Sequence, residues 1–270
     1  MLLANESDHP LNSEVDEGAL VTLIATVICD YGIIHASDSN LTGSPGLVAT
    51  GPKVFRLGFA NAALALAGSY AVGMTPMDNW LPACIAQYSA SPTPSLSGFA
   101  NHLAAELGSS ATAAKARLFH IAGYVNDAGG AHPEFYFVRN RQGINTTTGT
   151  YEGVTSSYQV TEDFWTRDYP KAPAGMFAAG GSQRYFNGFP SGRIAYLGAM
   201  QMLQRFYESV WSNPNWQFRR PRSLDELTAF VQLELETINT LFTSSDYPSP
   251  YIGGSIQIEK ISAPSNALSL

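Results

Sequence analysis

The N-terminal half of the chain alternates short apolar runs with turn residues, a pattern typical of β-hairpins. Four runs rich in apolar and β-branched residues predict strands over residues 20–29, 33–38, 53–57 and 62–67. Asp30, Tyr31 and Gly32 supply turn chemistry between the first two runs, and Gly68 with Ser69 ends the last one. Because the first two strands are apolar at nearly every position, we expect both of their faces to be covered.

The rest of the chain contains two pairs of helical segments, each followed by strands. Helices are predicted over residues 71–88, 95–107, 191–211 and 223–242, the last two with apolar residues spaced near 3.6. Ser223 and Glu226 form the sequence signature of a capping box at the start of the last helix. Further strands are predicted over residues 117–124, 133–139, 176–179 and 255–261. Residues 140–172 are polar and rich in turn residues, and they support no assignment.

This order of elements predicts an α+β fold. Strand runs separated by helix pairs favour antiparallel sheets with the helices packed outside them. We therefore expect a four-layer αββα sandwich, in which two antiparallel sheets lie between helix layers. The expected domain covers residues 22–262, preceded by a leader or propeptide over residues 1–21 and followed by a flexible tail over residues 263–270.

Charge and composition narrow the function classes. The net charge is −7 and no basic patch stands out, which argues against nucleic acid as the partner. No run approaches the roughly 18 apolar residues of a membrane span. The two cysteines, Cys29 and Cys84, form no metal or disulfide pattern and suit a cytoplasmic protein. Residues 1–21 hold five acids and no Lys or Arg, so the remainder carries a net charge of only −2.

Three residues near the first strands could form a nucleophilic site. If the first hairpin turns near Tyr31, Thr22 pairs within about two residues of Asp38. Lys53 opens the next strand and could reach the same end of the sheet. A partly desolvated Lys held by a carboxylate lowers the proton affinity of a nearby hydroxyl through its field. A free α-amine on Thr22, with a reference pKa of about 7.7–8.0, would be a suitable proton shuttle.

The spacing of these residues resembles the proteasome β-type subunits of the N-terminal-nucleophile hydrolases. The resemblance rests on residues 22–27, 32–42, 53–55 and 67–69, and on the 16-residue separation of Thr22 and Asp38. Residues 252–258 resemble the last strand of that family. The resemblance implies a threonine peptidase that acts on peptides or proteins without metal or cofactor. It also implies self-association into rings or stacked assemblies, with any ATPase partner unspecified.

The resemblance also implies a role for each matching residue. Thr22 would be the nucleophile, its own amine the base, and Asp38 and Lys53 would tune both. Gly68 would donate its backbone N–H to the oxyanion, and Thr42 would bind the substrate backbone. Asp246 and Ser249 have the spacing of the pair that orients the amine. If Gly253 and Gly254 are the anchor instead, those two roles fall on Ser249 and Ile252.

Two positions depart from the family pattern. Gly180 stands where a Ser assists the Thr amine, and Val21 stands where self-cleaving members carry Gly. An amide nitrogen at Thr22 cannot act as a base, which leaves three alternatives. The leader is removed by another route, the chain starts at position 21 with a Met that is then removed, or the protein is a non-catalytic structural subunit. An amidase or transpeptidase that uses the same acyl-enzyme is a further alternative.

Overall fold

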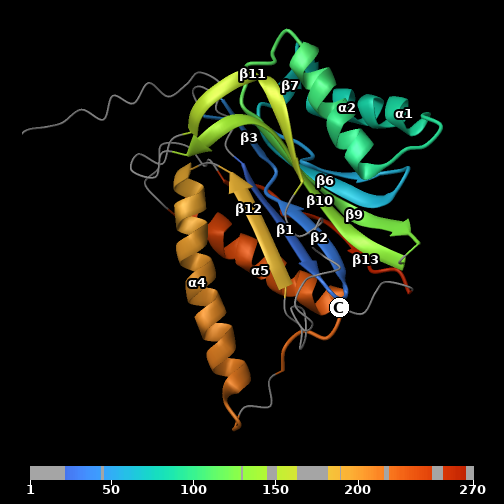
Figure 1. Ribbon diagram of the computed structural model, residues 1–270. Helices are drawn as coiled ribbons and strands as arrows, with labels where there is room; N and C mark the ends of the chain where they lie inside the picture. Colours follow the sequence, from blue (N-terminus) through green and yellow to red (C-terminus); the bar gives the residue numbers. More distant parts are fainter. Residues whose placement is uncertain are drawn as a thin grey trace, which may run out of the picture.

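The computed structural model describes residues 22–43, 46–128, 130–144, 151–162, 182–188, 190–215, 219–244 and 252–265. The predicted leader over residues 1–21 and the predicted strand over residues 176–179 lie outside this described part. The end of the predicted tail, residues 266–270, lies outside it as well. Figure 1 shows the arrangement of the described elements.

A four-stranded antiparallel sheet contains the first hairpin. Its strand order is β12-β1-β2-β13, with β1 at Leu23–Cys29, β2 at Gly32–Ser37, β12 at Ser182–Gly188 and β13 at Gln257–Ser262. In the β1–β2 register, Ile24 lies opposite Ser37. In the β2–β13 register, Ser37 lies opposite Gln257. Thr22 directly precedes β1 and Asp38 directly follows β2, so the two residues lie side by side at one end of the two central strands of this sheet.

A second antiparallel sheet has five strands in the order β11-β10-β9-β6-β5. Its strands are β5 at Val54–Leu57, β6 at Asn61–Gly68, β9 at Arg117–Asp127, β10 at Gly130–Ile144 and β11 at Tyr151–Glu162. Two short ribbons complete the described strands: β3 at Asn40–Gly43 with β4 at Gly46–Thr50, and β7 at Ala71–Val72 with β8 at Thr75–Pro76.

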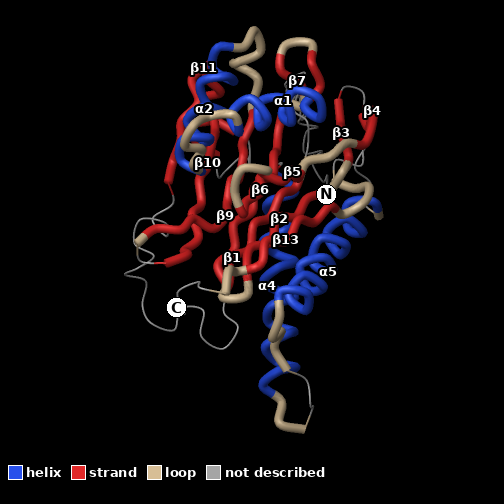
Figure 2. The backbone as a smooth tube through the Cα atoms, turned by 90° about the vertical axis from the view of Figure 1, so that its right-hand side faces the viewer, coloured by secondary structure: helices blue, strands red, loops and turns tan. Residues whose placement is uncertain are grey.

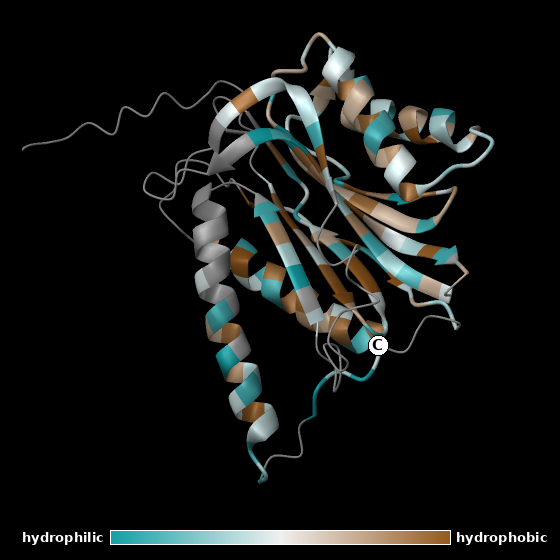
Figure 3. Cartoon of the chain, in the orientation of Figure 1, coloured by the Kyte–Doolittle hydropathy of each residue, from teal (hydrophilic) through white to brown (hydrophobic). Residues whose placement is uncertain are grey.

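Helices pack against both larger sheets, as Figures 1 and 2 show. The helices are α1 at Met77–Ser89, α2 at Leu96–Ser109, α4 at Pro190–Ser212 and α5 at Leu224–Thr243. Buried side chains of α1 and α2 share one cluster with β6, β9 and β10. Buried side chains of α5 share another with β1 and β2. Figure 3 shows the apolar stretches along the strands between them.

The two larger sheets contact each other through two further apolar clusters. One cluster joins Ile28 and Ile33 of the first sheet to Ala122 and Phe135 of the second. The other joins Ile24 of β1 to Ala65, Ala67 and Leu118. As predicted, β1 and β2 are buried along their whole length. Among the described helices, none is long and apolar enough to cross a membrane.

The expected four-layer αββα sandwich is wrong. Antiparallel strand is the largest class among the described residues, 42% against 33% helix. The strands are divided among several sheets, and no four-layer sandwich is evident in this part of the chain. Part of the reason lies in the polar stretch over residues 140–172, which supported no assignment but contributes β11 to a long hairpin with β10. Two of its side chains, Tyr158 and Val160, pack against the apolar cluster that contains the buried face of α2.

Two other differences have local causes. The helix predicted over residues 71–88 begins only at Met77, because Gly73 adopts φ +60° and turns β7 back along β8. Pro76 then precedes the helix in an extended conformation. Strand β12 was not predicted, since its sequence mixes polar and aromatic residues without an apolar run. At the start of α5, the Ser223 side chain accepts from the Glu226 N–H, as the capping box predicts.

Candidate functional site

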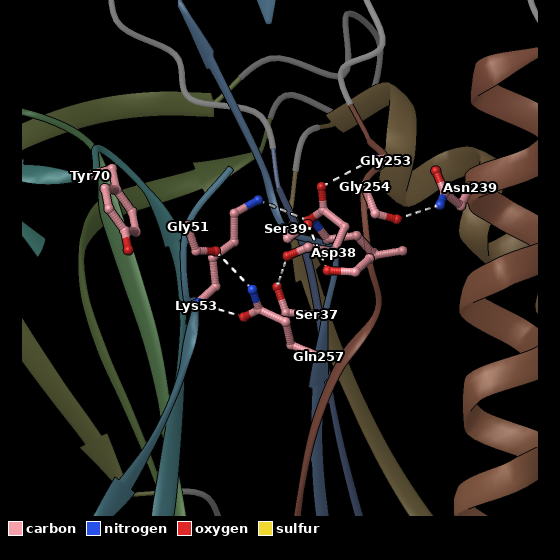
Figure 4. A network of polar contacts seen from close by, with 12 residues as sticks. Ser37, Asp38, Ser39, Gly51, Lys53, Tyr70, Asn239, Gly253, Gly254 and Gln257 are labelled. Atoms are coloured by element: carbon pink, nitrogen blue, oxygen red, sulfur yellow. Dashed lines mark hydrogen bonds and ion pairs between the residues drawn. The ribbon is translucent and has the colours of Figure 1, made fainter. Parts of the chain in front are cut away.

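Asp38 is the centre of the candidate site. It directly follows β2, its side chain is fully buried, and its carboxylate accepts three hydrogen bonds (Figure 4). Oδ1 accepts from the Leu23 N–H and from Lys53 Nζ, both at 2.9 Å, and Oδ2 accepts from the Gly253 N–H at 3.2 Å. A carboxylate with this many donors is strongly held in one orientation.

The hairpin register brings Thr22 next to this carboxylate. Leu23 O also accepts from the Asp38 N–H at 3.3 Å, so Leu23 and Asp38 extend the β1–β2 pairing by one step. Thr22 is the next residue and is buried. Ile24 packs between the sheets, whereas Leu23 packs toward α5. Since side chains alternate along a strand, continued alternation directs Thr22 toward the space between the sheets.

Lys53 reaches Asp38 from the second sheet. Lys53 precedes β5, its side chain is only 1% exposed, and its Nζ forms a buried ion pair with Asp38. Burial lowers the pKa of Lys53 below its ordinary value, and the attraction of Asp38 opposes that shift. Burial likewise raises the pKa of Asp38, against the effect of Lys53 and the two N–H donors. The structure therefore brings the predicted carboxylate and ammonium into direct contact.

Gly68 is the last residue of β6, at the end of that strand that lies near Lys53. The Leu66 N–H donates to Lys53 O at 2.9 Å, and Gly68 is two residues further along β6. Gly68 adopts φ +103°, and a Cβ there would lie 2.2 Å from Ala116 O. Only glycine fits this backbone. Gly68 thus lies near the Lys53 end of the site.

A loop from the C-terminal part of the chain completes the site. The resemblance offered Gly253 and Gly254 as an anchor but did not predict the contact of Gly253 with Asp38. Gly253 donates its N–H to Asp38, and its carbonyl accepts from the N–H groups of Ser39 and Asn40, both at 3.1 Å. Asn239 of α5 donates to Gly254 O at 3.0 Å. The adjacent Gly253 and Gly254 were the available signal, since paired glycines permit close backbone approach.

Of the remaining predicted residues, only Thr42 and Ile252 lie in the part of the chain that the structure describes. Thr42 lies in β3 opposite Leu47, directly after a register shift in the ribbon. Asp246 and Ser249, the predicted amine-orienting pair, lie outside the described residues, as do Val21 and Gly180. Ile252, the alternative to Ser249, is described and is buried in the apolar cluster beneath α5.

The site contains one carboxylate, one ammonium and several backbone donors. Within the described ranges, no group of three or more His, Cys, Asp or Glu residues could hold a metal ion. A scan against protein-family models finds no match, and no curated protein matches the chain. The resemblance to proteasome-type subunits, with the assembly, substrate and cellular location that it implies, stays a prediction.

Proposed function

We propose that this protein is an N-terminal threonine hydrolase that cleaves peptide or other amide bonds. The observation that carries the proposal is the buried ion pair between Lys53 and Asp38, whose carboxylate also accepts from the N–H of the residue after Thr22. Moving an ion pair out of water costs desolvation free energy, and the attraction within the pair offsets that cost only when further hydrogen bonds satisfy the buried groups. An ammonium at this position would favour the ionised form of a neighbouring hydroxyl.

The proposed reaction proceeds through an acyl-enzyme ester. Thr22 Oγ bonds to the substrate carbonyl carbon, and its proton passes to the free Thr22 α-amine. The Gly68 N–H would stabilise the oxyanion, a contribution of about 2.7–4 kcal/mol for comparable donors. The C–N bond then breaks, and the leaving amine takes the proton. Water then attacks the ester carbon while the α-amine accepts its proton. The bond from that carbon to Thr22 Oγ breaks, the proton passes from the amine to Oγ, and the acid product leaves.

The experiment requires a free Thr22 amine on a folded chain. A site-specific protease sequence placed in the leader, ending directly before Thr22, allows cleavage after the full chain has folded. The cleaved protein is treated with an epoxyketone or a β-lactone and analysed by intact mass and peptide mapping. We expect one adduct on Thr22, and its rate of formation should rise with pH as an amine of pKa about 8 loses its proton.

Matched variants separate the site from the rest of the surface. Thr22→Ala should abolish labelling, whereas Thr237→Ala, on an exposed face of α5, should leave it unchanged. Lys53→Met should slow labelling by at least about 100-fold, a range typical of one catalytic group. Lys260→Met removes the lysine of an exposed pair with Asp225 and serves as its control. If the cleaved protein is folded yet no adduct forms on Thr22, the proposed function is wrong and a non-catalytic subunit is favoured.

A further inference from the structure

We propose that Gln257 is a positioning residue that holds the backbone of Lys53 so that its ammonium meets Asp38. Its effect on catalysis rests on the proposed function, but its effect on Lys53 does not. Gln257 is the first residue of β13, opposite Ser37 and therefore adjacent to Asp38 in the register. Figure 4 shows its amide between the site and the segment that carries Lys53.

Both ends of the Gln257 amide are used. Oε1 accepts from the Lys53 N–H at 2.7 Å, and Nε2 donates to Gly51 O at 2.8 Å. A single side chain thus forms hydrogen bonds with the residues on both sides of Pro52. Like a peptide group in a neighbouring strand, it offers one donor and one acceptor. The carboxylate of Glu cannot donate, and the Met sulfur cannot donate and accepts only weakly, so this pairing is specific for an amide.

The topology explains why the segment needs such a partner. β5 is the last strand in the order of its sheet, and Lys53 directly precedes it. The Lys53 carbonyl is bonded to β6 through Leu66, whereas its N–H is bonded to Gln257. An edge segment without a neighbouring strand leaves its backbone groups without ladder partners. Gln257 takes the place of that missing strand and links the edge to the first sheet.

Gln257, Glu259 and Ile261 are alternate residues of β13 and so lie on the same face of the strand, which contacts the second sheet. Glu259 forms an ion pair with Arg56 of β5, at 2.7 Å, and Ile261 packs in the apolar cluster between the sheets. Gln257 is the member of this series nearest to Asp38. Sheet alignment is thus supported by Glu259 and Ile261, while Gln257 acts locally on Lys53.

The segment has two further attachments that do not involve Gln257. Tyr70 Oη donates to Pro52 O at 2.8 Å, and the Gly51 N–H donates to Ser39 O at 3.0 Å. A variant that lacks the Gln257 amide therefore keeps the segment attached and folded. We expect the Lys53 backbone to be released, so that Nζ no longer rests on Asp38 in a single geometry.

The test compares Gln257→Met and Gln257→Glu with the wild-type full chain by NMR. In the wild type, the Lys53 N–H should exchange slowly with solvent, and the Lys53 ammonium should give a slowly exchanging signal. Gln257→Met should accelerate exchange of the Lys53 N–H by at least tenfold and remove the ammonium signal. Gln257→Glu keeps the acceptor for Lys53 but not the donor for Gly51, and should give a smaller acceleration. Gln232→Met, which removes an exposed amide bonded to Glu236, is the matched control and should change neither signal.

A second readout connects the residue to catalysis. In protein cleaved before Thr22, Gln257→Met should reduce the maximal rate of epoxyketone labelling at least tenfold and leave the half-saturating concentration within twofold. An unlabelled wild type would overturn the proposed function, while the exchange measurement would still decide the role of Gln257. Unchanged Lys53 exchange and ammonium signals in folded Gln257→Met would overturn the positioning role. If that variant does not fold, the comparison of Gln257→Glu with the wild type decides in the same way.

Discussion

At the scale of single residues, Asp38 and Lys53 are not equivalent partners. Asp38 accepts from three donors, whereas Lys53 Nζ donates to Asp38 alone among the bonds described. Asp38→Ala leaves the Leu23 and Gly253 N–H groups and the ammonium without an acceptor. Lys53→Met leaves a carboxylate that still accepts from two N–H groups and can take up a proton. Asp38→Ala should therefore be the more destabilising change.

The expected magnitudes follow from burial. Breaking a buried pair by removing one partner typically costs about 3–5 kcal/mol, and we expect Asp38→Ala to fall in this range. Lys53→Met should cost less, because it leaves no buried N–H donor without an acceptor, and each such donor costs about 1–3 kcal/mol. Urea unfolding at pH 7 measures both. Asp225→Ala, in the exposed pair with Lys260, should change the midpoint little. An equal cost for both site variants would contradict the asymmetry.

At the scale of elements, glycines in loops and helices differ in what a side chain would meet. Gly254 has φ +77°, and a Cβ there would lie 2.3 Å from Ser39 Oγ. Gly73 has φ +60° with open space around it, and Gly198 in α4 has open space with no left-handed φ. The three positions therefore separate backbone strain from steric clash.

This separation predicts an order of stability for three alanine variants. Gly198→Ala should stabilise the protein by about 0.5–1 kcal/mol, since alanine is the better helix former. Gly73→Ala should cost about 1–2 kcal/mol for the left-handed backbone alone. Gly254→Ala should cost more than Gly73→Ala, because the clash with Ser39 adds to the strain. Thermal unfolding of the three variants measures this order of stability. A loss of stability in Gly254→Ala no larger than that in Gly73→Ala would contradict the expected clash with Ser39.

The same elements show how far the sequence could predict the site. The contact of Asp38 with the start of β1 follows from one hairpin, because a tight turn determines its own register. Lys53 was predictable as a strand start, although its reach to Asp38 depends on how two sheets pack. Gln257 was not predictable, since Gln257 and Glu259 alternate with Ile256 and Ile258 and so suggest a solvent face. That face instead meets the edge of the second sheet. Long-range packing of this kind leaves no local signal.

At the scale of the whole molecule, the two large sheets share a buried chain of polar groups. Thr26 Oγ1 lies 3.0 Å from Nδ1 of both His35 and His120, and Asn187 Nδ2 lies 2.9 Å from His120 Nε2. An amide NH₂ only donates, so His120 Nε2 accepts and its proton is on Nδ1. His120 then donates to Thr26, and the Thr26 hydroxyl donates to His35. This sequence of bonds requires both imidazoles to be neutral.

Acid should therefore loosen the contact between the sheets. Burial lowers the pKa of His35 from 6.5 to about 4, and burial lowers the pKa of His120 well below its ordinary value. Below pH 6.5 the unfolded chain binds protons that the native chain does not, so stability falls as the pH drops from 6.5 toward 4. His35 alone accounts for a loss of about 3 kcal/mol over this interval, at 1.36 kcal/mol per pH unit.

Urea unfolding between pH 7 and pH 4 measures this loss, and His35→Gln isolates one member of the chain of bonds. The amide oxygen of the new side chain can accept from the Thr26 hydroxyl but takes up no proton. The pH dependence of the unfolding free energy should therefore be smaller by the contribution of one titrating group. His120 continues to titrate only in the unfolded state, and the slope that remains should be of similar size. A His35→Gln protein with the wild-type pH slope would show that His35 is protonated in the native state. In that case the directional bonding from His120 through Thr26 could not be the arrangement that joins the sheets.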